Sequence, residues 1–118
     1  MPPAQPNRRA HPRFETSLSV EIYMADDVVH GVAKNLSLGG LGVGVDRTLP
    51  AQQQVGLSMF LTEEGIEDEL TDPLNVRGEI IWCTEDQGAF LAGLRFFSLQ
   101  PKEQERLQHF LRRLTGQG

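Results

Sequence analysis

Residues 18–45 read LSVEIYMADDVVHGVAKNLSLGGLGVGV, and their pattern predicts three short strands joined by tight turns. Apolar and polar residues alternate over 18–24, which is the period of a strand with one buried face. Asp26–Asp27 is typical of a turn, and 28–36 is the expected returning strand. Over 41–45 apolar residues alternate with glycine, which indicates a third strand.

The rest of the chain predicts three more strands. Residues 55–61 alternate in the same way, and 74–84 with 88–96 are expected to form a final hairpin around 85–87. Six short strands at hairpin spacing favour an antiparallel barrel. The predicted fold class is therefore all-β dominated, a six-stranded antiparallel β-barrel.

A helix is predicted after the barrel, over 101–114. Its apolar residues recur at i, i+3, i+4 and i+7, which places them on one helical face: Leu107, Phe110, Leu111 and Leu114. Pro101 suits the first helical position, and Gly116 follows the stop. We expect the apolar stripe to pack across an open end of the barrel. The alternative is that the stripe serves as a surface for a partner.

Length and composition fit one domain. The chain has 118 residues, of which 39% are apolar. We expect a flexible basic arm over 1–13, because it carries four prolines and no apolar anchor, and a barrel with its C-terminal helix over 14–118. No segment resembles a signal peptide or a membrane span, so the expected location is cytoplasmic. Cys83, the single cysteine, excludes an internal disulfide and is expected to pack as a small hydrophobe.

Charge is distributed unevenly along the chain. Residues 1–13 hold three arginines and no acid, whereas 14–118 hold 8 basic and 16 acidic residues, so charges of +3 and −8 make up the net −5. An acidic body disfavours DNA, RNA and anionic membranes, which need many basic residues on one face. A compact anion that meets the arm is the better fit.

Two short motifs carry the functional signal. Arg9-Ala-His-Pro-Arg13, with Arg8 just before it, has the form R-x-x-x-R. Asn35-Leu-Ser37-Leu-Gly-Gly40 has the form [D/N]-x-S-x-x-G. Each motif alone is weak, since it could be part of a basic arm or an ordinary hairpin turn. Their occurrence together, in this order, is much more specific.

Together the motifs resemble the signature of PilZ domains, the bacterial receptor modules for cyclic di-GMP. Residues 78–82, GEIIW, and 93–96, GLRF, are similar to the late strands of that family. The resemblance covers nearly the whole chain from Arg8 onward and implies a six-stranded barrel. It also implies the ligand-binding residues Arg8, Arg9, Arg13, Asn35, Ser37 and Gly40. Asn35 stands where aspartate is common in the family, so its bond to guanine should be weaker than a carboxylate's.

The ligand explains why these residue types are useful. A guanidinium can bind either a phosphate or the O6/N7 edge of guanine through two parallel hydrogen bonds. The Asn35 amide oxygen could accept from guanine N1–H or N2–H, and the Ser37 hydroxyl could bind a phosphate or a base edge. Gly40 permits either a close approach or a positive φ.

The resemblance implies that the arm folds over the barrel mouth when its arginines bind the ligand. A new surface for a partner protein would result. Arg8 adds charge and a planar stacking surface, which suits an intercalated dimer of cyclic di-GMP. Family members with this additional arginine tend to take the dimer, so two nucleotides per chain are predicted. The regulated process, whether motility, polysaccharide production or another, stays open.

Other classes fit less well. A PilZ-like adaptor that needs no nucleotide is the main alternative. A barrel for single-stranded nucleic acid would need aromatic platforms, and the aromatic residues are scattered, mostly in the phase of strand interiors: Phe14, Tyr23, Phe60, Trp82, Phe90, Phe96, Phe97 and Phe110. No catalytic residues, metal site or resident cofactor are expected, because the histidines are dispersed and no calcium loop, P-loop or nucleophile elbow occurs. The acidic run over 63–72 is expected to be a solvated loop.

Overall fold

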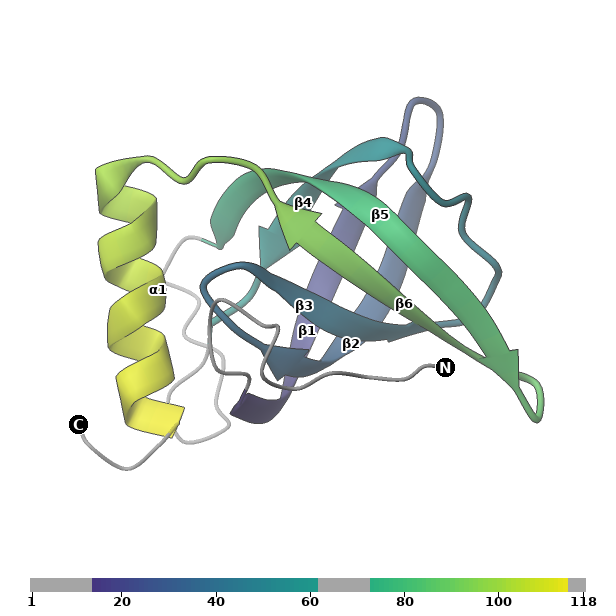
Figure 1. The fold of residues 1–118 in the computed structure, drawn as a ribbon, viewed down its shortest axis with the longest axis horizontal. Helices are drawn as coiled ribbons and strands as arrows, with labels where there is room; N and C mark the ends of the chain where they lie inside the picture. The colour runs from purple at the N-terminus through teal and green to yellow at the C-terminus, as the bar shows by residue number, and fades with distance from the viewer. Residues whose placement is uncertain (1–13, 62–72, 115–118) are drawn as a thin grey trace.

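The computed structural model describes residues 14–61 and 73–114, which form six strands followed by one helix (Figure 1). The elements are β1 (Phe14–Tyr23), β2 (Val28–Leu36), β3 (Gly40–Val45), β4 (Gln54–Met59), β5 (Leu74–Asp86), β6 (Ala89–Phe96) and α1 (Pro101–Leu114). The predicted arm over 1–13, the whole acidic run over 63–72 and Gly116 after the helix lie outside the described residues.

The strands close into a barrel in the order β1-β2-β3-β6-β5-β4, and each neighbouring pair is antiparallel. β4 completes the ring by pairing with β1, where Val20 lies opposite Met59. The prediction of a six-stranded antiparallel barrel with a C-terminal helix is therefore confirmed.

The barrel interior is apolar because every second residue of each strand points inward. Residues from all six strands are almost completely buried there, among them Ile22, Leu36, Leu41, Leu57, Ile80 and Leu94. The outward positions between them are mostly polar or glycine, but they also include exposed apolar residues such as Val32, Trp82 and Leu91. The core thus occupies the inside of the barrel and leaves the outer wall available for a ligand.

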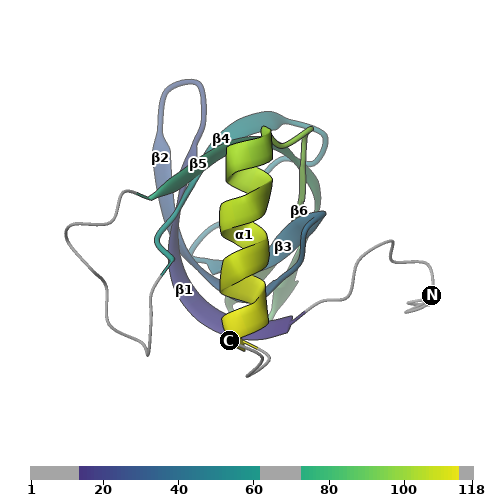
Figure 2. The same ribbon diagram turned by 90° about the vertical axis from the view of Figure 1, so that its left-hand side faces the viewer.

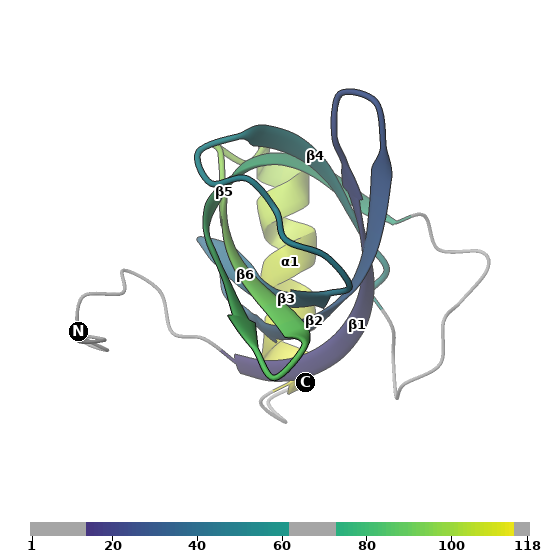
Figure 3. The ribbon, with the colours of Figure 1, turned by 90° about the vertical axis from the view of Figure 1, so that its right-hand side faces the viewer.

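Both ends of the barrel are covered. Helix α1 lies across one end, where Leu107, Phe110 and Leu111 are buried (Figure 2). At the opposite end, the segment after β3 crosses the opening, and its Leu49 is 4% exposed (Figure 3). The Leu49 N–H points to the Cys83 sulfur at 3.4 Å. The predicted packing of the helical stripe is confirmed for these three residues, whereas Leu114 is 37% exposed. Cys83 is a half-buried residue against the core.

Element boundaries differ from the sequence prediction in several places. β1 begins at Phe14, four residues before the predicted start, because its pairing with β2 continues to Phe14 past an irregular register between Glu15 and Leu18. β4 covers Gln54–Met59 and ends before the predicted 61. The last hairpin turns at Gln87–Gly88 instead of 85–87, with φ values of 55° and 86°. Positive φ at both central residues is typical of a two-residue turn that matches the twist of the strands. No described helix is long and apolar enough to cross a membrane.

Candidate ligand-binding site

The second motif forms the turn between β2 and β3. The Ser37 N–H donates to the Gly40 carbonyl at 2.9 Å. The Ser37 hydroxyl oxygen accepts from the N–H groups of Gly39 at 3.1 Å and Gly40 at 3.2 Å, and it lies 3.3 Å from the Gly40 carbonyl. Since Ser37 is only 4% exposed, its hydroxyl holds the turn in shape. Its predicted contact with a ligand remains a prediction.

Position 40 must be glycine because β3 and β6 approach each other closely there. A Cβ at this position would lie 2.1 Å from the Leu94 carbonyl oxygen on β6. Its φ is not positive; Gly88 is the glycine with that conformation among the described residues. Of the two roles that the sequence leaves open for Gly40, the structure supports the close approach.

Asn35 is fixed over the outer wall by its neighbours. Its Oδ1 accepts the Gly42 N–H at 3.1 Å, and a Cβ at Gly42 would lie 2.8 Å from Nδ2. The ladder between β2 and β3 is irregular between Ala33 and Asn35. An amide oxygen can accept two hydrogen bonds, and this property suits the type of contact that guanine N–H groups make.

A bare strip of backbone runs beside Asn35 across the outer wall. We call it the glycine shelf, and it consists of the outward positions Gly42 and Gly44 on β3 and Gly93 on β6. Gly42 lies directly opposite Gly93. Because glycine has no side chain, neighbouring side chains can lie directly against the backbone here, as Asn35 does at Gly42 and Trp82 does at Gly93.

Trp82 borders the far side of the glycine shelf. It pairs with Gly93 across β5 and β6, and a Cβ at Gly93 would lie 2.4 Å from both Cε2 and Nε1 of the indole. The ring therefore lies over Gly93, and the residue is 38% exposed. Asn35, Gly42, Gly93 and Trp82 thus form one cross-strand row with a hydrogen-bonding group at one end and an aromatic ring at the other.

The sequence prediction missed Trp82. It placed the aromatic residues mostly inside the strands, which is wrong for Trp82, exposed at 38%. An irregularity between Ile80 and Trp82 shifts the phase of β5, so simple alternation fails there. A tryptophan and a glycine in facing strands, Trp82 and Gly93, are the signal that could have found it.

Arg95 adds a cation beside the motif turn. It lies opposite Gly40 on β3 and opposite Glu79 on β5. Its Nη2 is 2.7 Å from Glu79 Oε1, and its guanidinium lies 5.6 Å from the centre of the Phe97 ring. The Arg95 side chain is 59% exposed, so it can reach a ligand at the edge of the turn while keeping these contacts.

The first motif joins the site through the start of β1. Arg8, Arg9 and Arg13 lie outside the described residues. Phe14, the first described residue, is paired with Leu36, immediately before Ser37. The segment that carries the arginines is thus covalently attached beside the second motif.

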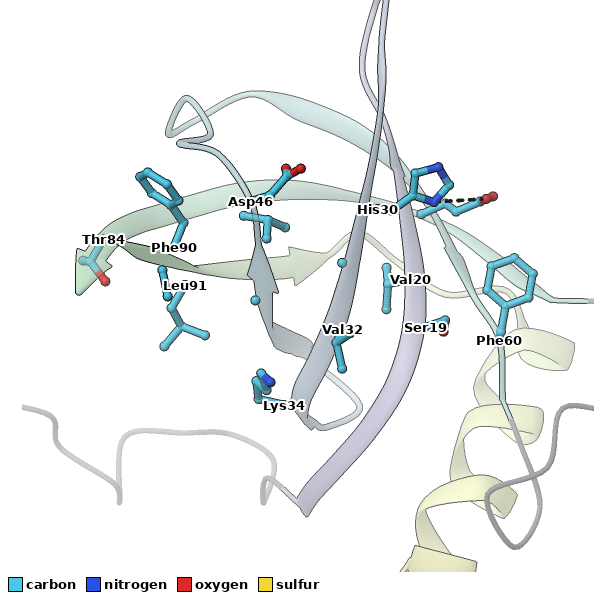
Figure 4. A pocket seen from close by; sticks show the side chains of 15 residues that line it. Ser19, Val20, His30, Val32, Lys34, Asp46, Phe60, Thr84, Phe90 and Leu91 are labelled. Carbon is cyan, nitrogen blue, oxygen red and sulfur yellow. Dashed lines mark ion pairs between the residues drawn. The ribbon is translucent and has the colours of Figure 1, made fainter. Parts of the chain in front are cut away.

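An open groove of about 900 Å³ adjoins the glycine shelf (Figure 4). Its lining near the shelf includes Val32, Lys34, Gly44 and Leu91, and Val32, Gly44 and Leu91 form a second cross-strand row. A volume of this size is in the range of small-molecule sites.

Two further chemical features bear on the site. The hydrogen bond that the Tyr23 hydroxyl donates to Glu21 raises the pKa of Tyr23, and this pair lies toward β4, away from the shelf. Within residues 14–61 and 73–114, no cluster of three or more histidine, cysteine or acidic side chains could hold a metal.

The closed six-stranded barrel with its terminal helix defines the class of this protein as a small β-barrel domain. The sequence matches the family model of the PilZ domain over residues 7–113, and the chain belongs to the PilZ domain family. Among curated proteins, none matches the sequence.

Solved structures share the fold. The PilZ domain of YcgR from Escherichia coli, solved with c-di-GMP, is 16% identical, with 92% of each chain covered and a TM-score of 0.75. The Bacillus subtilis inhibitor of motility (MotI/DgrA) is 19% identical with a TM-score of 0.75. The match covers 94% of this chain and 53% of that protein, so this chain spans about half its length. The PilZ domain of CeSA from a cellulose-synthesizing bacterium is 20% identical, with 89% and 96% covered and a TM-score of 0.56.

Proposed function

We propose that this chain is a non-catalytic receptor for cyclic di-GMP in the bacterial cytoplasm. The observation that carries the proposal is the cross-strand row from Asn35 to Trp82, placed beside the point where the arginine motif is attached. Family membership and the nucleotide-bound YcgR domain support the same ligand.

The site supplies the contacts that a guanine needs. The exposed face of the Trp82 indole can stack on a base, and such stacking is worth about 1–3 kcal/mol. Asn35 offers its oxygen to the base edge, and Gly42 and Gly93 let the Asn35 and Trp82 side chains lie flat against the barrel wall beneath the base. Arg95, beside the motif turn, provides a further donor for a phosphate or a base.

Arg8, Arg9 and Arg13 complete the site from the arm. Their positive charges attract the two phosphates of the ligand. The acidic body, in contrast, repels anions in general. We infer that the arm changes conformation when it binds the nucleotide and that a partner protein recognises the result. MotI is an inhibitor of motility in Bacillus subtilis, so motility is one output to test for this chain.

One observation favours the alternative function, an adaptor that binds a protein partner without nucleotide. The Ser37 hydroxyl and the Asn35 amide already have hydrogen-bonding partners without a ligand, so the motif turn is complete as a structural element. A domain that binds only a protein partner would keep the same fold.

Isothermal titration calorimetry of the full chain distinguishes the two functions. We expect cyclic di-GMP to bind with a dissociation constant between nanomolar and tens of micromolar, or roughly −7 to −12 kcal/mol. GTP and linear GMP should bind much more weakly, because neither holds two guanines and two phosphates in one ring. Absence of saturable heat at about 100 μM protein, well above that range, would favour the adaptor.

A further inference from the structure

We propose that Lys34 is an additional ligand-binding residue, whose ammonium group binds a phosphate of the nucleotide, and that Gly44 positions it. The inference rests on the proposed function and adds a cation that neither motif contains. Four observations support it: the bulge in β2, the space over Gly44, the missing ion pair and the charges along the groove.

The bulge in β2 turns two consecutive residues outward. Ala33 and Leu36 are both completely buried, so the two residues between them occupy the outer wall. The irregular register between Ala33 and Asn35 accommodates this extra outward residue. Lys34 and Asn35 therefore lie side by side on the ligand face, which regular alternation would not allow.

Gly44 gives the Lys34 side chain its place on the shelf. A Cβ at Gly44 would lie 3.1 Å from Lys34 Cε, which is tighter than an ordinary contact. The next nearest atoms, the carbonyl oxygens of Val32 and Phe90, would be 3.8 and 3.9 Å away. The lysine stem thus extends from β2 over β3 because Gly44 has no side chain, and this carries the ammonium group onto the glycine shelf.

Lys34 has no carboxylate to neutralise it within the part of the chain that the structure describes. Two arginines of the outer surface do have one: Arg47 lies 2.8 Å from Asp27, and Arg95 lies 2.7 Å from Glu79. A lysine ammonium is a compact charge that suits a phosphate oxygen. The unneutralised charge lies beside Asn35, where the proposed ligand would bind.

The groove next to Lys34 restricts where a phosphate can bind. Its lining also includes Glu21 and Asp46, whose carboxylates repel an anion. Lys34 lies at the end of the groove away from Asp46, next to the apolar side chains of Val32 and Leu91 (Figure 4). A phosphate is therefore favoured at the Lys34 end of the groove, close to the motif.

The first test is calorimetry of cyclic di-GMP with the full chain and three lysine variants. Lys34→Met keeps the apolar stem and removes the charge, and we expect about tenfold weaker binding, the lower range for a charged hydrogen bond. Lys34→Arg should stay within about threefold of the parent. Lys102 is an exposed lysine on α1, at the barrel end that this helix covers. Lys102→Met is therefore the matched control and should bind like the parent.

Salt provides a readout that a purely structural role would not change. The difference between the parent and Lys34→Met should shrink between about 0.05 and 0.5 M NaCl, because exposed charges are screened. If the parent binds and Lys34→Met binds equally well, the lysine assignment is wrong and the receptor function stands. If the parent itself fails to bind, both proposals are wrong.

The second test addresses Gly44. Gly44→Ala should displace mainly the Lys34 side chain, so we expect about threefold weaker binding in the parent and no further loss in the Lys34→Met background. An equal loss in both backgrounds would show that Gly44 acts independently of Lys34 and would overturn its positioning role.

Discussion

Gly93→Ala should weaken both nucleotide binding and folding by moving one ring. The added Cβ would lie 2.4 Å from Cε2 and Nε1 of Trp82 and 2.7 Å from Cζ2. Ordinary contacts begin near 3.4 Å, so the indole must move outward by about 1 Å or rotate away. Because Trp82 is already 38% exposed, it can leave the sheet without disturbing the barrel interior.

The magnitude follows from the lost contacts. An aromatic side chain buries about 150–250 Å². If roughly half of that area is exposed again, at about 25 cal/mol per Å² the loss is about 2–3 kcal/mol. The reduced freedom of alanine in the unfolded chain offsets about 0.4–1 kcal/mol. We therefore expect about 1–2 kcal/mol lower unfolding free energy and, with the stacking surface displaced, about 10–100-fold weaker binding of cyclic di-GMP.

Trp82 is the single tryptophan of the chain, so its fluorescence reports on this site alone. Emission should shift to longer wavelength in Gly93→Ala, and nucleotide should quench it in the parent. Urea unfolding and calorimetry supply the two free energies. Gly56→Ala is the matched control, because its Cβ would meet only the Tyr23 Cβ, at 3.6 Å.

A double-mutant cycle separates the effect of displacing the Trp82 ring from any other effect of Gly93→Ala. In a Trp82→Ala background the collision is absent, so Gly93→Ala should cause little further loss. Parent-like emission, stability and binding in Gly93→Ala would refute the account of the glycine shelf. So would an unchanged penalty in the Trp82→Ala background.

Three further predictions concern the motif residues. Arg9→Ala and Arg13→Ala should each weaken cyclic di-GMP binding by about 1.5–3 kcal/mol in calorimetry; parent-like affinity in both variants would remove them from the site, and thermal melting should be unchanged. Asn35→Ala or Ser37→Ala should weaken binding less, whereas Ser37→Ala should also lower the unfolding free energy by about 1–2 kcal/mol because it removes the turn's hydrogen bonds, which denaturant titration measures. The parent should bind two nucleotides per chain and Arg8→Leu should shift the calorimetric ratio towards one; a ratio near one in both proteins would contradict the role of Arg8.

Regular periodicity accounts for what could be predicted of the fold. Residues 28–36 and 101–114 have the expected bounds because their ends are marked by turn and capping residues. β1 and the last hairpin turn differ because a bulge and a positive-φ turn change the local geometry without changing the hydrophobic pattern.

The site was less accessible to sequence reasoning. The Asn35–Gly40 motif is contiguous, so its turn could be predicted. Trp82 and Gly93 meet only through strand pairing, and Lys34 faces outward only because of a bulge. Such neighbours depend on register, which a single sequence specifies poorly.

The glycine shelf lies on the convex outside of a barrel whose interior is filled and whose two ends are covered. A nucleotide bound there would keep one broad face toward solvent instead of disappearing into a cavity. The second messenger would then be part of the epitope, and a partner could read its atoms directly. A receptor built this way needs no rearrangement of its hydrophobic core in order to signal.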